Sequence, residues 1–204
     1  MEKPICECDN EPKETFADKV KGLFHRFSKP KIGVGSVAPT VEGLCYSNGE
    51  IKQFSRKKDT FLVLVFYCRD FSVVCPKELV EVNNKFEMFE SKNAEVVGIS
   101  VDPIESHKKL CQTTDKKSIG ALKYPLISDE NHKISESFGL MSFTGVSNRA
   151  TVIIDPQGIV RSLTVHSLVS ARNVDDILKD LGNMQKSAIV ERNTTSTTVQ
   201  HVFV

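Results

Sequence analysis

The strongest pattern along the chain is an unbroken run of apolar residues, Phe61-Leu-Val-Leu-Val-Phe-Tyr67, rich in aromatic and β-branched side chains. A run of this length and composition predicts a strand buried on both faces, as in the middle of an α/β sheet. The next run predicts a helix that begins at Pro76, because a proline suits a first helical turn. One face of this helix carries apolar residues at three- and four-residue intervals, namely Leu79, Val82, Phe86 and Phe89.

The hydrophobic pattern predicts further strands and helices before and after this strand and helix. Before the central strand, Asn48-Gly49, the dipeptide most typical of a tight hairpin, separates two short strands. The predicted elements after the Pro76 helix are, in order, a strand at 95–101, a helix from 102, a helix ending at 139, a hairpin of 151–155 and 159–165, and a helix from about 170. This order predicts one α/β domain with a mixed central sheet and helices on both faces.

Both ends of the chain lie outside the predicted domain, which covers residues 32–185. Residues 1–31 are a polar, variable extension whose apolar residues would share one side of a short helix: Phe16, Val20, Leu23, Phe24 and Phe27. Packing on its own domain or on a sister subunit suits such a helix better than contact with a membrane or another partner. Residues 186–204 are rich in threonine and serine, show no periodicity and predict a flexible tail.

Composition narrows the classes of function. Lysine plus arginine (27 residues) nearly balances aspartate plus glutamate (26), so no overall field favours nucleic acid or an anionic membrane. The sequence shows no apolar stretch of membrane-spanning length and no secretory leader, which predicts a cytoplasmic protein with reduced thiols. The six cysteines include no Cys-x-x-Cys pair, so neither a metal site nor a thioredoxin-type disulfide reductase is indicated.

Cys75 differs from the other cysteines in its predicted position. It lies where the buried strand gives way to a helix N-terminus, and there the N–H groups and the positive end of the helix dipole favour a thiolate. A thiolate is a nucleophile at neutral pH. The alternative is that Cys75 is a small buried hydrophobic residue, which is the commoner role of a cysteine near a core strand.

The segment around it, Asp70-Phe-Ser-Val-Val-Cys-Pro-Lys-Glu78, resembles the active-site segment of the peroxiredoxins, in the subfamily of typical two-cysteine enzymes and alkyl hydroperoxide reductases. The resemblance continues, in the same order, through Val96-Val-Gly-Ile-Ser-Val-Asp102, Tyr124-Pro-Leu-Ile-Ser-Asp129 and Arg149-Ala-Thr-Val-Ile-Ile-Asp-Pro-Gln-Gly158. It implies a thioredoxin-like fold and a thiol-dependent peroxidase that reduces hydrogen peroxide and organic hydroperoxides without a metal or organic cofactor. It also implies a homodimer that could assemble further into a ring.

The resemblance also implies roles for individual residues. Cys75 matches the peroxidatic cysteine, which forms a sulfenic acid, and Ser72 matches a hydroxyl position that is usually threonine. Arg149 matches an arginine that lowers the pKa of the thiol and polarises the peroxide. Glu78, which would orient that arginine, and Arg172, a second arginine near the site, match supporting positions. Without the resemblance, Ser72 would be read as a helix cap and Arg149 as a loop arginine.

Two features depart from the family pattern. The family's proline seven residues before the peroxidatic cysteine is Cys68 here, and no cysteine follows Cys111, whereas typical members carry a resolving cysteine in a C-terminal Val-Cys-Pro segment. Turnover would then follow a one-cysteine route with an external thiol such as thioredoxin or glutathione. Otherwise Cys68, Cys45 or Cys111 would serve as an atypical resolving cysteine. The simpler interpretation of Cys68 is an inert wall of the pocket.

Two other functions stay open at this point. A catalytically weakened homologue could act as a redox sensor, a chaperone or a scaffold, and steady turnover with a small thiol would separate it from a peroxidase. In addition, Val202-Phe203-Val204 ends the sequence with the hydrophobic-x-hydrophobic carboxylate that PDZ domains bind by strand addition.

Overall fold

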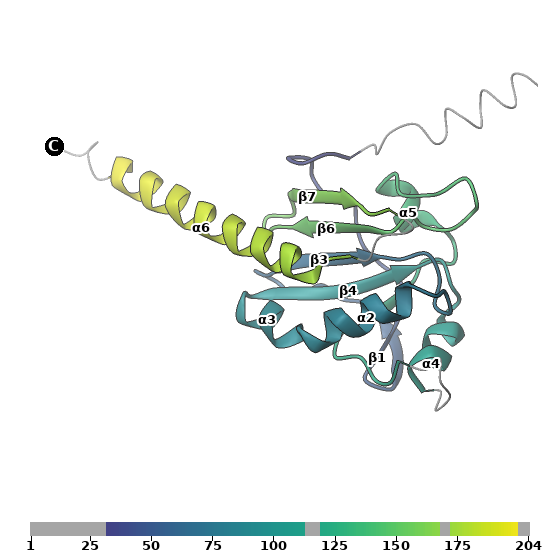
Figure 1. Cartoon of the computed structure of the whole chain (residues 1–204). Coiled ribbons are helices and arrows are strands. Elements are labelled where there is room, and N and C mark those ends of the chain that lie inside the picture. Colours follow the sequence, from purple (N-terminus) through teal and green to yellow (C-terminus); the bar gives the residue numbers. More distant parts are fainter. Residues whose placement is uncertain (1–31, 113–118, 168–171, 200–204) are drawn as a thin grey trace, which may run out of the picture.

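The computed structural model describes residues 32–112, 119–167 and 172–199, which are built around one sheet (Figure 1). Its seven strands lie in the order β2-β1-β5-β4-β3-β6-β7. They are β1 (Leu44–Ser47), β2 (Glu50–Gln53), β3 (Phe61–Phe66), β4 (Ala94–Ser100), β5 (Leu126–Ser128), β6 (Ala150–Ile154) and β7 (Val160–Val165). β4 is parallel to both β3 and β5, and the other neighbours are antiparallel. The predicted mixed sheet is confirmed.

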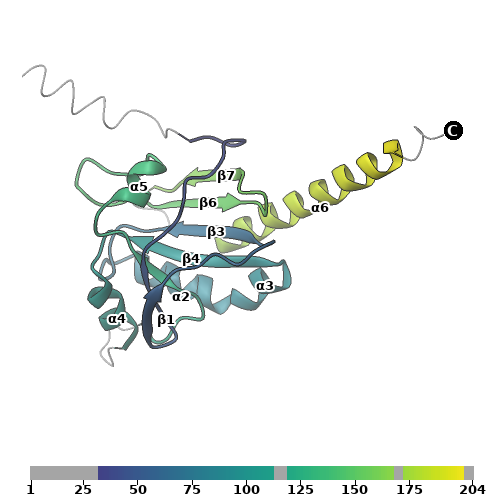
Figure 2. The ribbon, with the colours of Figure 1, turned by 180° about the vertical axis from the view of Figure 1, so that it is seen from behind.

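Helices cover both faces of this sheet, as Figures 1 and 2 show from opposite sides. They are α2 (Cys75–Asn84), α3 (Phe86–Ser91), α4 (Ile104–Gln112), α5 (Lys133–Ser137) and α6 (Val174–Val199). On one face, α2, α3 and the start of α6 contribute Leu79, Phe89 and Leu178 to a buried apolar cluster. On the other face, α5 contributes Ile134, and the segment before β1 contributes Ile32. The prediction of helices on both faces is therefore confirmed.

Strand β3 forms the centre of both clusters. All six of its residues are buried, because it lies between β4 and β6 with packed side chains above and below it. Val63 and Val65 belong to the cluster under α2, whereas Leu64 and Phe66 belong to the cluster under α5. Complete burial of such side chains contributes about 1.5–3 kcal/mol each. The strand is thus a firmly held base for the segment that follows it, residues 67–75.

The structure refines the predicted elements. Asn48 and Gly49 both have positive φ angles, 52° and 87°, as the two central residues of a type I′ hairpin require, and they join β1 to β2. The helix predicted after Pro76 is two helices, because the backbone leaves the α-helical path at Lys85 (φ −104°, ψ 13°). Strand β5 is missing from the predicted order, since three residues are too few to show a period.

The predicted flexible tail is wrong for residues 186–199, because α6 continues through Val199. Adding turns to a helix costs little once its first turns are fixed. The first turns of α6 are held by four buried residues, Val174, Ile177, Leu178 and Leu181. In Figure 1 the later turns extend away from the sheet. No helix among the described residues has both the length and the apolar character needed to cross a membrane.

Two predicted segments lie outside the described residues. They are the amphipathic helix within residues 1–31 and the C-terminal Val202-Phe203-Val204.

Candidate active site

Cys75 is the first residue of α2 and is fully buried. Its backbone N–H donates a hydrogen bond to Oγ of Ser72 over 3.2 Å, and Pro76 occupies the first helical turn. The positive end of the helix dipole therefore lies at the residue that carries the sulfur, and the backbone N–H groups that donate to the sulfur belong to Cys68 and Arg69 of the preceding loop. This position results from the sequence order, a buried strand followed by a short turn and a proline-initiated helix.

The loop between β3 and α2 brings a second thiol against Cys75. Sγ of Cys68 lies 3.1 Å from Sγ of Cys75, and Cys68 is partly exposed. A hydrogen bond from the Cys68 thiol is the largest influence that lowers the pKa of Cys75, and hydrogen bonds from Ser72 and from backbone N–H groups act in the same direction against the effect of burial. The same contact raises the pKa of Cys68 well above its usual range. The negative charge therefore resides on Cys75.

One turn further along α2, Glu78 joins two buried arginines. Arg149 donates from Nε to Oε2 of Glu78 over 3.2 Å, and its Nη2 donates to Oε1. Arg149 Nη1 also donates to the carbonyl of Ser167. The backbone N–H of Arg172 donates to Oε1 of Glu78 over 2.5 Å, and its Nη2 donates to the carbonyl of Phe66 over 2.7 Å. One carboxylate thus faces two guanidinium groups.

The excess positive charge of the two arginines interacts with Cys75. In the described part of the chain, Nε and Nη1 of Arg172 are buried without a hydrogen-bond partner. Burial lowers the pKa of Arg172 to about 10, and the charge of Arg149 acts in the same direction, while negative charge on Glu78 and on Cys75 opposes the shift. A thiolate at Cys75 therefore stabilises Arg172, and the reverse also holds.

The structure brings the predicted site residues together in two groups at the N-terminal end of α2. The first consists of the residues in contact around the sulfur, namely Cys75, Ser72 and Cys68. The second consists of the residues in contact around the carboxylate, namely Glu78, Arg149 and Arg172. The first group presents a nucleophile with hydrogen-bond donors, and the second supplies positive charge behind it.

A buried polar network beside Cys68 was not predicted. The hydroxyl of Tyr67 donates to Oδ1 of Asp70 over 2.8 Å, and Nδ1 of His107 lies 3.0 and 2.9 Å from the two carboxylate oxygens of Asp70. Nε2 of His107 faces the carbonyl of Ile127 at 3.2 Å, so both ring nitrogens lie within hydrogen-bond distance of an acceptor. The only local sequence signal is the pair Tyr67 and Asp70 on either side of Cys68. The network holds the loop that carries Cys68.

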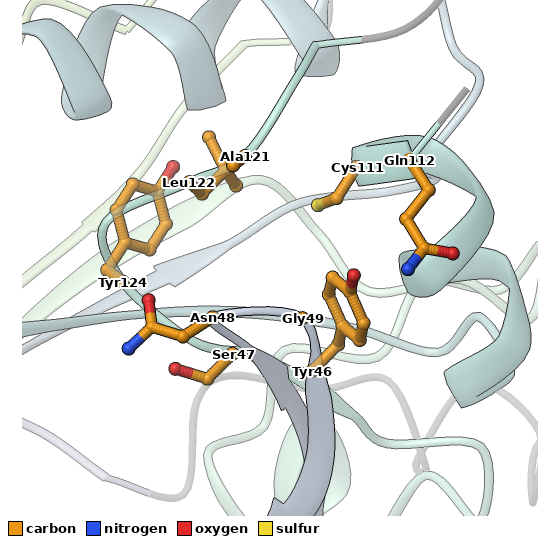
Figure 3. Close-up of a pocket in the computed structure, with 9 residues that line it drawn as sticks. All are labelled: Tyr46, Ser47, Asn48, Gly49, Cys111, Gln112, Ala121, Leu122 and Tyr124. Carbon is orange, nitrogen blue, oxygen red and sulfur yellow. The ribbon is translucent and has the colours of Figure 1, made fainter. Parts of the chain in front are cut away.

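The other two candidate resolving cysteines lie elsewhere. Cys45 belongs to the apolar cluster on the face of the sheet opposite Cys75. Cys111, at the end of α4, lines a separate cavity of about 130 Å³ beside the β1–β2 turn, together with Tyr46 and Tyr124 (Figure 3). Burial raises the pKa of both thiols, that of Cys111 to about 11. Among the described residues, neither of these thiols forms a hydrogen bond with Cys75, and burial disfavours the thiolate form of both.

No metal centre is apparent in the described ranges, since none of their His, Cys, Asp and Glu side chains form a group of three or more that could hold an ion.

Comparison with known proteins places this geometry among related chains. The AhpC/TSA family model matches residues 34–163. A putative peroxiredoxin, ycf42, of Pyropia yezoensis is 37% identical over 156 residues, which cover 74% of this chain and 78% of that relative. The mitochondrial thioredoxin-dependent peroxide reductase of Drosophila melanogaster is 38% identical over 152 residues, which cover 72% of this chain and 65% of that relative.

Solved structures of a peroxiredoxin and of an AhpC protein are also similar to this chain. The reduced 2-Cys peroxiredoxin of Plasmodium vivax superposes with a TM-score of 0.72 at 31% identity, covering 76% of this chain and 98% of that one. AhpC of Enterococcus faecalis superposes with a TM-score of 0.71 at 28% identity, covering 76% of this chain and 93% of that one. The range matched by the family model, 34–163, includes Cys75 and all of the sheet except the last residues of β7.

Proposed function

The chain belongs to the AhpC/TSA family, and on that premise we propose a peroxidase cycle in which Cys75 attacks the peroxide and Cys68 of the same chain resolves the product. The family and the fold, which is the thioredoxin-like fold of the peroxiredoxins, make the chain a peroxiredoxin-type peroxidase. We assign the reaction to Cys75 and Cys68 because their two sulfur atoms lie 3.1 Å apart.

In the first step, the Cys75 thiolate attacks one oxygen of the peroxide. A sulfur–oxygen bond forms, the oxygen–oxygen bond breaks, and the leaving alkoxide or hydroxide takes a proton from water. The sulfur is oxidised by two electrons to a sulfenic acid, and the peroxide is reduced by the same two. The lowered pKa of Cys75 provides the nucleophile, and the positive charge of the Arg149 and Arg172 pair favours an anionic leaving group.

In the second step, Cys68 attacks the sulfur of the Cys75 sulfenic acid. A disulfide forms, the sulfur–oxygen bond breaks, and the hydroxyl leaves as water with the proton of the Cys68 thiol. A disulfide requires the sulfur atoms at about 2.05 Å, so they must approach by about 1 Å from their present separation. A movement of that size is within the reach of a loop residue. Resolution in this way needs no second subunit.

The disulfide would then be reduced by an external thiol. A relative from Drosophila melanogaster is called a thioredoxin-dependent peroxide reductase, which makes thioredoxin our proposed reductant, with glutathione as the alternative. Cys68 is partly exposed and Cys75 is buried, so an incoming thiolate would attack the sulfur of Cys68 and release Cys75 as a thiolate. The release of the cysteine with the lower pKa favours this direction.

The test is intact-mass analysis of fully reduced protein after one equivalent of hydrogen peroxide, with Cys75→Ser as the control. We expect the loss of two hydrogen atoms per chain and a peptide that joins Cys68 to Cys75, and no change in the control. A chain that gains one oxygen atom at Cys75 and stays in that form would contradict resolution by Cys68. Steady consumption of peroxide with thioredoxin and its reductase separates an enzyme from a one-turnover sensor.

The oligomeric state and the compartment stay predictions. We propose a homodimer, with a ring as a further assembly, in the cytoplasm. Sedimentation of the reduced and the oxidised chain would test the first of these proposals, and fractionation of the source cells would test the second.

A further inference from the structure

We propose that Cys68 acts in both steps of the cycle: its thiol is the hydrogen-bond donor that holds Cys75 as the attacking thiolate, and only afterwards does it become the resolving nucleophile. The second role rests on the proposed function above. The first role assigns to Cys68 a part in the attack on the peroxide itself. Two features support this role, the contact between the sulfur atoms and the different surroundings of the two.

A separation of 3.1 Å is close enough for a hydrogen bond between two sulfur atoms, in which either could be the donor. Their surroundings decide which one is. Cys75 is the first residue of α2, at the positive end of the helix dipole, and its charge interacts favourably with the buried Arg172. Cys68 lies before the helix and is partly exposed. The negative charge is therefore more stable on Cys75, which leaves the proton on Cys68.

The thiolate needs this donor because it is buried. Burial disfavours a charged sulfur, and each hydrogen bond to the charged form offsets part of that cost. The Ser72 hydroxyl has one hydrogen to donate, and its oxygen already accepts the backbone N–H of Cys75. The Cys68 thiol contributes a second side-chain donor, and its effect on the pKa of Cys75 exceeds that of Ser72.

The same contact fixes the order of events. While Cys75 is a thiolate, deprotonation of Cys68 would place two negative charges 3.1 Å apart, so Cys68 stays protonated and unreactive. Once Cys75 has become a neutral sulfenic acid, that repulsion is gone. The proton that Cys68 shared with the thiolate can then pass to the departing hydroxyl as the disulfide forms. Cys68 therefore reacts only after Cys75 has been oxidised.

Two substitutions separate the roles. Cys68→Ser keeps a hydroxyl donor and cannot form a disulfide, whereas Cys68→Ala loses both functions. We would follow the oxidation of Cys75 in a single turnover by stopped flow across a range of pH, and titrate the thiolate by its ultraviolet absorbance. In Cys68→Ala we expect the midpoint of both profiles to rise by about one pH unit, with about tenfold slower oxidation below the midpoint. Cys68→Ser should keep its midpoint within about half a unit of the wild type.

An unchanged midpoint in Cys68→Ala, or an equal shift in both variants, would overturn the donor role. Neither result would affect the disulfide, which the mass measurement on the wild-type chain tests independently. Conversely, a wild-type chain without the disulfide would refute resolution and leave the midpoint shift intact. Cys68→Val, which fills the site without a donor, should shift the midpoint as Cys68→Ala does, and it provides the measurement if the smaller side chain leaves the protein unfolded.

Discussion

Replacement of Glu78 by alanine should destabilise the fold far more than the loss of one surface charge. Its side chain is 4% exposed, and its carboxylate accepts hydrogen bonds from Nε and Nη2 of Arg149 and from the backbone of Arg172. Without it, the two buried guanidinium groups keep only the Cys75 thiolate as a counter-charge, and Arg149 loses its ion-pair partner. Removal of one partner of a buried ion pair costs about 3–5 kcal/mol. We expect Glu78→Ala to lower the unfolding free energy by about this amount, and Glu78→Gln by an amount near its lower limit.

The same helix offers a matched control. Glu81 lies one turn further along, its side chain is 46% exposed, and it pairs with Lys85 over 2.9 Å. An exposed pair of this kind contributes about 0–1 kcal/mol, so Glu81→Ala should change the unfolding free energy by no more than that. Urea unfolding of the reduced chains, followed by circular dichroism, measures both variants under identical conditions. Losses of similar size for Glu78→Ala and Glu81→Ala would refute the role of Glu78 as a buried counter-charge.

Two further predictions concern the thiolate and the sheet. The pKa of Cys75 is lower in the folded chain than in the unfolded one, so its thiolate adds stability that is lost as the pH falls towards the folded pKa. The raised pKa of Cys68 has the opposite effect on stability, but only above about pH 8.5, where an unfolded thiol would lose its proton. The unfolding free energy of the reduced wild type should therefore rise relative to that of Cys75→Ser by up to about 1.4 kcal/mol per pH unit between about pH 6 and about pH 8. Urea unfolding at several pH values measures this, and a difference between the two proteins that does not change with pH would contradict it. In β4, a methyl group at Gly98 would lie 2.5 Å from Cδ2 of Leu126, so Gly98→Ala should cost about 1–3 kcal/mol in thermal unfolding. Gly33→Ala, with no atom within 4 Å of its added methyl, should change stability by less than about 0.5 kcal/mol, and equal effects would argue against overpacking at Gly98.

The sequence predicts those parts of the fold in which a long periodic pattern meets a clear stop signal. The strand β3 and the hairpin at Asn48 are of this kind, and the mixed sheet follows from the order of the elements. The break at Lys85 and the strand β5 are too short to leave a period in the sequence. The helix at residues 186–199 contradicts its composition, because the packed start of α6 rather than local preference stabilises those turns.

Predictability of the site falls as the separation along the chain grows. The contact of Ser72 with Cys75 spans three residues and follows from the start of a helix. The sulfur contact spans seven residues and depends on the path of a loop that no pattern describes. Contacts over 37 residues, as in the Asp70 network with His107, and over 71 residues, as between Glu78 and Arg149, depend on which strands are neighbours. Only family resemblance indicated Arg149 in advance.

The charges around the start of α2 explain why these distant residues belong with the two cysteines. Arg149 and Arg172 are both buried, and Glu78 neutralises only one of them. A thiolate at Cys75 supplies the second negative charge, so the reduced site is the state in which these buried charges balance. Oxidation to a sulfenic acid or a disulfide removes that charge and leaves the arginines with an excess of one. The buried arginines therefore favour reduction back to the Cys75 thiolate, and the same excess of positive charge stabilises the anion that leaves during the attack on the peroxide.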